Sequence, residues 1–486
     1  MSLSVGERRI LLGHSYYLRY DPKQLARMKP YPPLATLLAA SVLRNRDIGV
    51  TLFDAMLADG VGEFVTALDA DAPPVVAIIE DNFNFLTKMC TVRMREAACE
   101  MIRVAKARGC RVMVNGSDAT DRPGVYVAAG ADAVIVGEVE DTCAEVAEAW
   151  LARPAAPLET IRGLILPGAA SGNGAANTPR RTPARPFRND LDALPFPAWD
   201  LVDVERYRAA WRVAHGRFSW NAVTSRGCPY RCNWCAKPVF GTRYAQRSPD
   251  DVAEELGQLK RTVAPDHVWF ADDIFGITPG WITEFAGAVA ARDARIPFMM
   301  QSRANLLKPA CVEALAAAGA EEVWLGVESG SQRILDAMDK GTRVAHVRAA
   351  TRALRGAGIR SGWFLQLGYL SEDWDDILLT RDLVRDERPD EIGVSVAYPL
   401  PGTRFYEMVR EQLGSKQNWD DSDDLAMMFR GTYTTPFYRE IRDLLHDEAD
   451  AGIRGRSVLD GFDARWDALA AREAAYRSDR VPTPAS

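Results

Sequence analysis

The chain has 486 residues, which corresponds to two to four domains at about 100 to 200 residues each. It carries 59 basic and 66 acidic residues, a net charge of −7, and 47% of its residues are hydrophobic. This near-average composition argues against a polybasic nucleic-acid binder and against a disordered chain. No apolar run reaches the roughly 20 residues of a membrane-spanning helix, and no signal peptide is evident. We therefore expect a cytoplasmic protein with no nucleic-acid partner and no membrane span.

The first 150 residues alternate between short apolar segments and helical stretches. Strands are expected at 9–13, 50–54, 75–80, 111–115 and 133–137, with helices at 34–44, 94–108 and 142–151. This alternation predicts a doubly wound, flavodoxin- or Rossmann-like parallel sheet over residues 1–155, whose ligands bind at the carboxyl ends of the strands. The first strand is not followed by a Gly-x-Gly-x-x-Gly turn, which disfavours a nicotinamide or flavin dinucleotide.

Composition changes after this region. Residues 163–189 are rich in Gly, Ala, Pro, Asn and Arg without periodicity, which predicts an exposed linker. Residues 191–199 combine prolines with apolar side chains, so we expect them to pack across the junction of the two halves. The linker and junction together are assigned to residues 156–215.

A second alternation occupies residues 216–405. Strands are expected at 220–225, 267–271, 298–302, 322–327, 362–367 and 393–397, with helices at 249–263, 280–291, 309–318, 332–339, 344–356 and 374–385. Six such pairs are too few for a closed eight-stranded barrel and predict a partial (β/α)6 barrel, open on one side. Residues 406–486 are expected to form a helical C-terminal region with a frayed tail.

Three of the eight cysteines lie close together, at Cys228, Cys232 and Cys235, directly after the first strand of the second half. Iron–sulfur clusters are held by cysteine sulfur. Three ligands would leave one iron of a four-iron cluster without a protein ligand, which makes that iron a site for chemistry. A zinc site would require a fourth Cys or His at short spacing, and none is present nearby. A chance group of buried thiols is the other alternative.

The segment Cys228-Pro-Tyr-Arg-Cys232-Asn-Trp234-Cys235 resembles the Cys-x3-Cys-x-aromatic-Cys signature of the radical SAM superfamily. The resemblance implies a [4Fe-4S] cluster whose unique iron binds the amino and carboxylate groups of S-adenosylmethionine. It also implies that one electron cleaves the bound molecule to methionine and a 5′-deoxyadenosyl radical.

The remaining strand ends offer groups that such a ligand requires. S-adenosylmethionine carries an ammonium, a carboxylate, a ribose diol and an adenine, which call for acids, a cation and planar surfaces. The candidate contacts are Trp234, Asp272, Asp273, Arg303, Glu328, Gln366 and Tyr398. Any one of them alone is more often a helix cap or a surface ion pair. Their occurrence at successive strand ends favours a binding site.

The loop after the fifth strand of this half departs from the family pattern. Gly368-Tyr-Leu-Ser-Glu372 stands where Gly-x-Pro-Gly-Glu is common. The usual turn residues are missing, which leaves the geometry of this loop near the substrate open.

An α/β sheet ahead of a radical SAM core resembles the cobalamin-binding domain of the cobalamin-dependent radical SAM enzymes. Segments 31–40, 115–120 and 130–140 carry this likeness. The candidate cobalamin contacts are Tyr16, Tyr17, Glu80, Asn82, Asn84, Ser117, Asp118 and Glu138. The Asp-x-His-x-x-Gly motif is absent around His14, so we expect cobalamin without a histidine lower ligand. The alternative is a purely structural flavodoxin-like domain.

These resemblances imply an enzyme that methylates an unactivated carbon of a small molecule through methylcobalamin, with an electron donor such as flavodoxin or ferredoxin. No individual catalytic residue is identified. A first alternative keeps both cofactors without methyl transfer, as in oxidative cyclisation of a tetrapyrrole-like substrate. A second alternative, from another class, is a non-catalytic cobalamin sensor or an iron–sulfur electron carrier.

Overall fold

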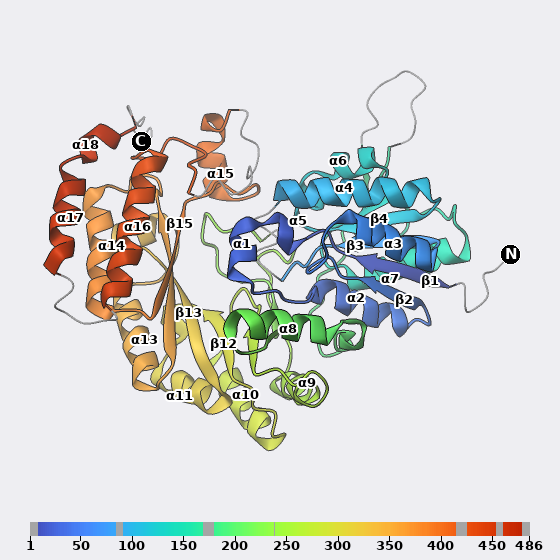
Figure 1. Ribbon diagram of the computed structural model, residues 1–486, viewed down its shortest axis with the longest axis horizontal. Coiled ribbons are helices and arrows are strands. Elements are labelled where there is room, and N and C mark those ends of the chain that lie inside the picture. The colour runs from blue at the N-terminus through green and yellow to red at the C-terminus, as the bar shows by residue number, and fades with distance from the viewer. Residues whose placement is uncertain are drawn as a thin grey trace.

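A computed structural model of the protein describes residues 8–83, 91–168, 179–237, 239–414, 425–452 and 460–478. Two sheets with their covering helices lie next to each other, and the C-terminal helices pack on the far side of the second sheet (Figure 1). The expected α/β class, with a sheet domain followed by a partial barrel and a helical region, is confirmed. Among the described residues, no helix combines the length and the apolarity that crossing a membrane requires.

The first sheet has the strand order β2-β1-β3-β4-β5-β6-β7, and β1 to β5 are parallel. Its parallel strands are β1 (Arg9–Gly13), β2 (Gly49–Phe53), β3 (Val75–Ile79), β4 (Arg111–Asn115) and β5 (Ala133–Ile135). Its principal helices are α2 (Leu34–Arg44), α3 (Val61–Asp71), α4 (Thr91–Ala107) and α7 (Glu140–Ala152). Every residue of β3 is buried, as is typical of a parallel strand covered by helices on both faces.

The order of the first five strands is that of a flavodoxin-like sheet. In such sheets the connections reverse direction between β1 and β3, and ligands bind in the crevice at the carboxyl ends of these two strands. Here those ends lead into His14 and Ser15 after β1, and into Glu80 to Asn82 after β3. The sheet topology therefore selects one edge as the candidate ligand site.

The expected linker contains more structure than its composition indicated. β6 (Leu164–Leu166) pairs antiparallel with β5, and β7 (Arg180–Arg181) pairs antiparallel with β6, so both extend the first sheet. Strands of two or three residues are too short to give a periodic pattern, which explains why the sequence did not reveal them. Residues 169–178 lie outside the described part.

The junction segment packs across both halves, as expected. Phe196 O accepts a hydrogen bond from Ser41 Oγ at 2.6 Å on the first half. The Trp199 ring lies 5.5 Å from that of Trp220 on the second half. Helix α8 (Val204–His215) follows, and its Tyr207 donates a 2.7 Å hydrogen bond to Asp54 of the first half.

The second sheet consists of six parallel strands in the order β8-β11-β12-β13-β14-β15. The strands are β8 (Ser219–Ala222), β11 (His267–Phe270), β12 (Phe298–Ser302), β13 (Ala320–Glu328), β14 (Arg360–Leu367) and β15 (Glu391–Val396). The intervening helices are α9 (Pro249–Thr262), α10 (Pro279–Ala291), α11 (Pro309–Ala318), α12 (Gln332–Ala337), α13 (Val344–Gly356) and α14 (Trp374–Glu387). A separate short pair joins β9 (Ser225–Arg226) and β10 (Ala245–Gln246).

The C-terminal region is helical, with α15 (Arg404–Val409), α16 (Thr435–Gly452), α17 (Asp460–Ala470) and α18 (Glu473–Tyr476). Figure 1 shows α16 beside α14, with α17 and α18 further from the first sheet. Phe437 and Tyr438 of α16 are fully buried, so these aromatic residues belong to the core. Residues 479–486 lie outside the described part.

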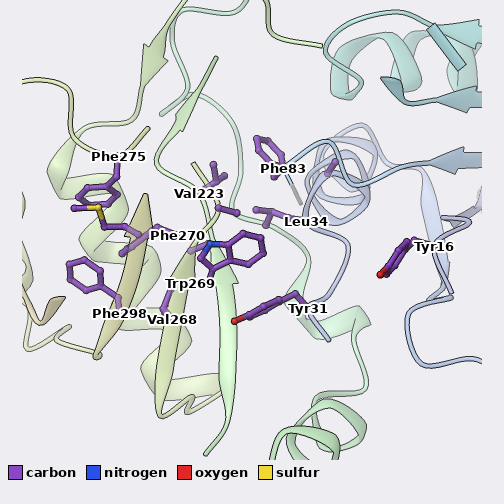
Figure 2. Close-up of a cluster of buried hydrophobic side chains, with 14 of the residues drawn as sticks. Tyr16, Tyr31, Leu34, Phe83, Val223, Val268, Trp269, Phe270, Phe275 and Phe298 are labelled. Atoms are coloured by element: carbon purple, nitrogen blue, oxygen red, sulfur yellow. The ribbon is translucent and has the colours of Figure 1, made fainter. Parts of the chain in front are cut away.

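One apolar core joins the two halves. Tyr31 and Leu34 of the first half lie beside Val223 and Trp269 of the second (Figure 2). The ring centroids of Tyr31 and Trp269 are 4.8 Å apart, and the Tyr31 hydroxyl lies 3.1 Å from Ser219 Oγ. The apolar contact between the two halves is therefore part of one core that extends into both domains.

A buried group of charges links the two carboxyl-terminal edges at the same interface. Arg226 Nη1 lies 2.7 Å from Glu138 Oε1, and its Nη2 lies 2.6 Å from Glu140 Oε1. Its guanidinium also faces the rings of Phe83 and Phe240, which are themselves 5.3 Å apart. The three charged side chains are 3 to 10% exposed. We call Arg226, Glu138 and Glu140 the interdomain latch.

Arg226→Met is expected to lower the free energy of unfolding by ~3–5 kcal/mol, because it leaves two buried carboxylates without a cation. The measurement is urea-induced unfolding. The matched control is Arg180→Met, which breaks an ion pair with Glu159 whose side chains are half exposed and is expected to change stability by less than about 1 kcal/mol. Equal losses in the two variants would contradict a stabilising latch.

The loop from β14 to α14 forms a regular turn despite its unusual sequence. Glu372 N donates to Tyr369 O at 3.0 Å, and Ser371 has φ +66° while Leu370 keeps a negative φ. This is the pattern of a type II turn, in which Pro and Gly are preferred at the two central positions. The loop thus forms this turn without proline or glycine at its centre, and Ser371 takes the left-handed conformation that a glycine would adopt.

Ser371→Gly is expected to raise the free energy of unfolding by ~0.5–1 kcal/mol, because it relieves the left-handed strain and only part of the gain is offset by unfolded-state entropy. Thermal or urea unfolding measures the change. Ser371→Ala removes the same hydroxyl but keeps the strain, so it is expected to bring no gain. A gain of the same size in both variants would show that the hydroxyl, and not φ, is responsible.

Candidate functional site

The three clustered cysteines lie on one loop that begins directly after β9. All three side chains are partly buried free thiols. Gly227 starts the loop with φ +75°, and a Cβ on it would come within 2.2 Å of Arg243 O, so only glycine fits there. The loop is thus fixed at its entry by close backbone packing.

The type and number of donors on this loop match a multinuclear metal group. Burial raises the pKa of the Cys228 thiol, and it raises that of Cys235 to about 12. Such thiols ionise when a metal binds them. No three His, Cys, Asp or Glu side chains in the described ranges converge on a single ion. An iron–sulfur cubane does not need that convergence, because each cysteine serves a different iron. The donor set therefore fits a cluster held by three thiolates.

Asp272 shapes the approach to this loop. Its carboxylate accepts hydrogen bonds from Thr224 N at 3.1 Å, from Thr224 Oγ1 at 2.7 Å and from Ser225 Oγ. Burial raises the pKa of Asp272 to about 6, against the opposing effect of these bonds. Asp272 thus holds the chain just before the cysteines, and its contact with S-adenosylmethionine stays a prediction. Asp273 is exposed, and its charge acts on Cys228 and Cys235.

Arg303, at the end of β12, is directed to the cysteine loop. Its Nη1 donates to Cys232 Sγ at 3.5 Å, and its guanidinium lies 3.9 Å from the centroid of the Tyr230 ring. It also donates to Thr342 Oγ1 at 3.1 Å and to Lys340 O. Arg303, predicted as a contact of S-adenosylmethionine, is thus hydrogen-bonded to the cysteine loop.

The other strand ends present polar atoms that have no protein partner in the described part of the chain. Trp234 Nε1, Ser302 Oγ and Gln366 Oε1 are enclosed and make no hydrogen bond there. Such atoms are rare in folded proteins and require explanation by water or a ligand. Glu328 at the end of β13 is buried, and Tyr398 after β15 is partly buried. These positions surround the carboxyl end of the second sheet.

The crevice between β1 and β3 is also polar. Ser15 donates from its N (3.2 Å) and from its Oγ (2.5 Å) to Glu80 Oε1, while Glu80 Oε2 is enclosed and has no partner within the described ranges. Burial raises the pKa of Glu80 to about 7. Asn82 Nδ2 donates to Asn115 Oδ1 at 2.8 Å. Glu80 and Asn82 therefore lie at the edge selected by the topology, with Ser117 at the start of the short helix α5 (Ser117–Asp121).

Three other residues predicted to contact cobalamin have different surroundings. Tyr17 is 1% exposed in the core on the α3 and α4 side, and Asp118 forms an ion pair with Arg95 at 2.5 Å. Glu138 is a latch residue, and its second oxygen accepts from Arg188 N at 2.7 Å. In the structure Tyr17 thus lies in the core, Asp118 in an ion pair and Glu138 in the latch, and their contacts to cobalamin stay predictions.

Tyr16 and Asn84 are the remaining residues predicted to contact cobalamin. Tyr16 is fully buried in the core shared with the second half, and its hydroxyl donates to Asp21 at 3.4 Å. Asn84 lies outside the described residues. Tyr16 is therefore part of the shared core, and the prediction for Asn84 stays a prediction.

Arg226, Ser15 and Lys340 were not among the candidate site residues predicted from the sequence. Arg226 had one local signal, its position immediately before Gly227 and Cys228. Ser15 and Lys340 gained significance only through partners distant in sequence, Glu80 and Glu328.

Comparison with known proteins agrees with this geometry. Residues 222–384 match the Radical SAM superfamily. An uncharacterized methyltransferase of Pyrococcus horikoshii is 26% identical over 394 residues, covering 80% of this chain and 81% of that protein. The anaerobic magnesium-protoporphyrin IX monomethyl ester cyclase of Synechocystis is 29% identical over 231 residues, 47% of this chain and 45% of that protein.

A solved structure has a similar fold over most of the chain. The radical S-adenosylmethionine methyltransferase TsrM of Kitasatospora setae, determined with cobalamin and a [4Fe-4S] cluster bound, superposes with a TM-score of 0.67 and 18% identity. The match covers 84% of this chain and 78% of TsrM, so it includes both sheets. With the cysteine loop at the carboxyl end of the partial barrel, these findings show a radical SAM domain over residues 222–384 and a fold similar to that of TsrM over most of the chain.

Proposed function

We propose that the protein is a cobalamin-dependent radical SAM methyltransferase that acts on an unactivated carbon of a small molecule. One observation carries the proposal: the carboxyl-terminal edges of both sheets meet at the latch of Arg226, Glu138 and Glu140. Each of these edges is where its type of sheet binds ligands. The methyltransferase relatives and the cobalamin in TsrM support the proposal.

Each group of the second site has a proposed role. Cys228, Cys232 and Cys235 hold the cluster, and Arg303 donates a hydrogen bond to one of these sulfurs. The contacts to S-adenosylmethionine come from Trp234, Asp273, Glu328, Gln366 and Tyr398. When bound, the cofactors supply a carbon radical and a transferable methyl group. The protein orients them and excludes water from the interface.

Cobalamin is proposed to lie against the crevice between β1 and β3, within reach of Glu80, Asn82 and Ser117. His14 is held by other partners, because its Nε2 lies 2.9 Å from Asp54 Oδ1 and 3.0 Å from Ala55 N. This favours cobalamin without a histidine lower ligand. We further propose a flavodoxin or ferredoxin as electron donor and a cytoplasmic location, with domains at 1–155, 156–215, 216–405 and 406–486.

Similarity to the magnesium-protoporphyrin cyclase favours one alternative reaction. The shared segment covers less than half of the cyclase. In this alternative the same cofactors carry out an oxidative cyclisation of a tetrapyrrole-like substrate without methyl transfer. A cobalamin sensor or an electron carrier remains the alternative of another class, although a carrier has no need of a three-cysteine site with an open iron.

Cys232→Ala is expected to abolish both the cluster and the reductive cleavage of S-adenosylmethionine, because a thiolate ligand is lost. Iron content and 5′-deoxyadenosine are measured in anaerobically reconstituted protein. The matched control is Cys311→Ala, a buried cysteine of α11, which is expected to retain both. If Cys232→Ala formed deoxyadenosine like the unmodified protein, or if the unmodified protein formed none, the enzyme assignment would fail.

Methyl-deuterated S-adenosylmethionine separates methyl transfer from cyclisation. A methyltransferase is expected to place the label in the product, whereas a cyclase would give a product that has lost hydrogen and carries no label. Mass spectrometry of the product reads both outcomes. Omitting cobalamin is expected to abolish labelling while leaving cluster content unchanged, and labelling at full rate without cobalamin would contradict the proposed cofactor role.

A further inference from the structure

The segment 338–342, between α12 and α13, holds two parts of the cluster site. Asn233, within the cysteine loop, donates from its N to Met338 O at 3.0 Å. Arg303 donates to Lys340 O and, at 3.1 Å, to Thr342 Oγ1. The cysteine loop and the end of β12 are thus fastened to one short stretch of chain.

The Lys340 side chain from this segment makes a buried ion pair. Its Nζ lies 2.7 Å from Glu328 Oε1, and the two side chains are only 6% and 7% exposed. The ammonium also lies 5.9 Å from the centroid of the Trp234 ring, next to Cys235. A charge this deeply buried requires an opposite charge, so each partner depends on the other.

The backbone of β13 is shaped around this pair. The register between β13 and β14 shifts between Gly326 and Glu328, a bulge-like irregularity, and Glu328 has φ +65°. Bulges near active sites re-aim side chains, and a left-handed residue that is not glycine costs about 1–2 kcal/mol. A Cβ on Gly326 would lie 2.7 Å from Lys340 Nζ and 2.8 Å from Glu328 Oε1. The register shift, the left-handed Glu328 and the missing side chain of Gly326 therefore together allow the Glu328 carboxylate to contact the Lys340 ammonium.

We infer that Lys340 is a positioning residue for S-adenosylmethionine, acting through Glu328. Lys340 fixes Glu328 by Oε1, and Glu328 Oε2 has no hydrogen-bond partner in the described part of the chain. That oxygen, at the carboxyl end of β13, accepts a hydrogen bond from the ribose hydroxyls or the ammonium of the ligand. The inference rests on the radical SAM assignment and on none of the cobalamin chemistry.

The test measures the equilibrium dissociation constant for S-adenosylmethionine in reconstituted protein without cobalamin or substrate. Lys340→Met is expected to raise this constant at least ~10-fold, the usual size of a lost hydrogen bond to a charged group. Iron content is expected to remain that of the unmodified protein, because Arg303 is held by the Lys340 carbonyl and not by its side chain. The matched control is Lys308→Met, an exposed lysine before α11, which is expected to change nothing. A wild-type dissociation constant for Lys340→Met would overturn the inference.

A double-mutant cycle separates positioning from a general structural effect. If Lys340 acts through Glu328, Lys340→Met weakens binding in the unmodified protein but adds little in the Glu328→Gln background. An equal loss of affinity for S-adenosylmethionine in both backgrounds would overturn the inference. Should Lys340→Met alone fail to fold, Gly326→Ala provides a second route, because it disturbs the pair while keeping both charges. Gly326→Ala is expected to weaken binding with iron content retained, and unchanged binding would again overturn the inference.

The assay distinguishes this inference from the proposed methylation. It needs neither turnover nor cobalamin. A protein that binds S-adenosylmethionine through Glu328 but never methylates would therefore support the inference on Lys340 and contradict the proposed methyltransferase function. The EPR signal of the reduced cluster gives an independent readout, because coordination of S-adenosylmethionine at the unique iron changes the environment of the cluster. In Lys340→Met this spectral change is expected to require correspondingly higher ligand concentrations.

Discussion

The arrangement of the two halves depends on the pairing of one buried cation. Arg226 lies two residues before Cys228 and contacts carboxylates that follow β5 of the other sheet. A buried guanidinium without its partners is strongly destabilising, so orientations that separate these elements are disfavoured. The contact between Tyr31 and Trp269 adds buried apolar area, but it depends far less on orientation than the ion pairs of Arg226 do. Electrostatics therefore fixes an alignment that hydrophobic burial alone would leave adjustable.

This constraint joins the cluster loop to the neighbouring sheet. The loop is fixed at its entry by Gly227 and the latch. Asp272 holds the chain just before it, and Arg303 and the segment 338–342 hold it further along. A site held from several directions keeps reacting groups within a few tenths of an ångström, which is the requirement for controlled radical chemistry. Protein groups thus provide position and exclusion of water, while the cofactors provide reactivity.

Local sequence patterns predicted the elements well because most of them are long and strongly periodic. The limits of β1, β4, β12, α2 and α13 were predicted to the residue, and the other expected strands differ by a few residues at their ends. The cysteine loop was predictable because all its ligands are close in sequence. β6 and β7 were missed because two or three residues cannot show a period.

The direction of side chains at strand ends could not be predicted in the same way. Tyr16 and Tyr17 are adjacent, yet they lie in different cores because successive side chains point to opposite faces. Asp272 and Asp273 are likewise adjacent, yet the first is buried and the second is exposed. Lys340 and Arg226 depend on partners 12 and 86 to 88 residues away. Such pairs are properties of the folded chain, and spacing in the sequence does not reveal them.

The short strand β7 has a consequence beyond the site. It ends the first sheet with the exposed side chains of Arg180 and Arg181. An edge strand leaves backbone donors and acceptors open to pairing with another chain, and two adjacent positive charges on a two-residue edge make such pairing unfavourable. The extension that follows β5 therefore disfavours pairing of this edge of the first sheet with another chain.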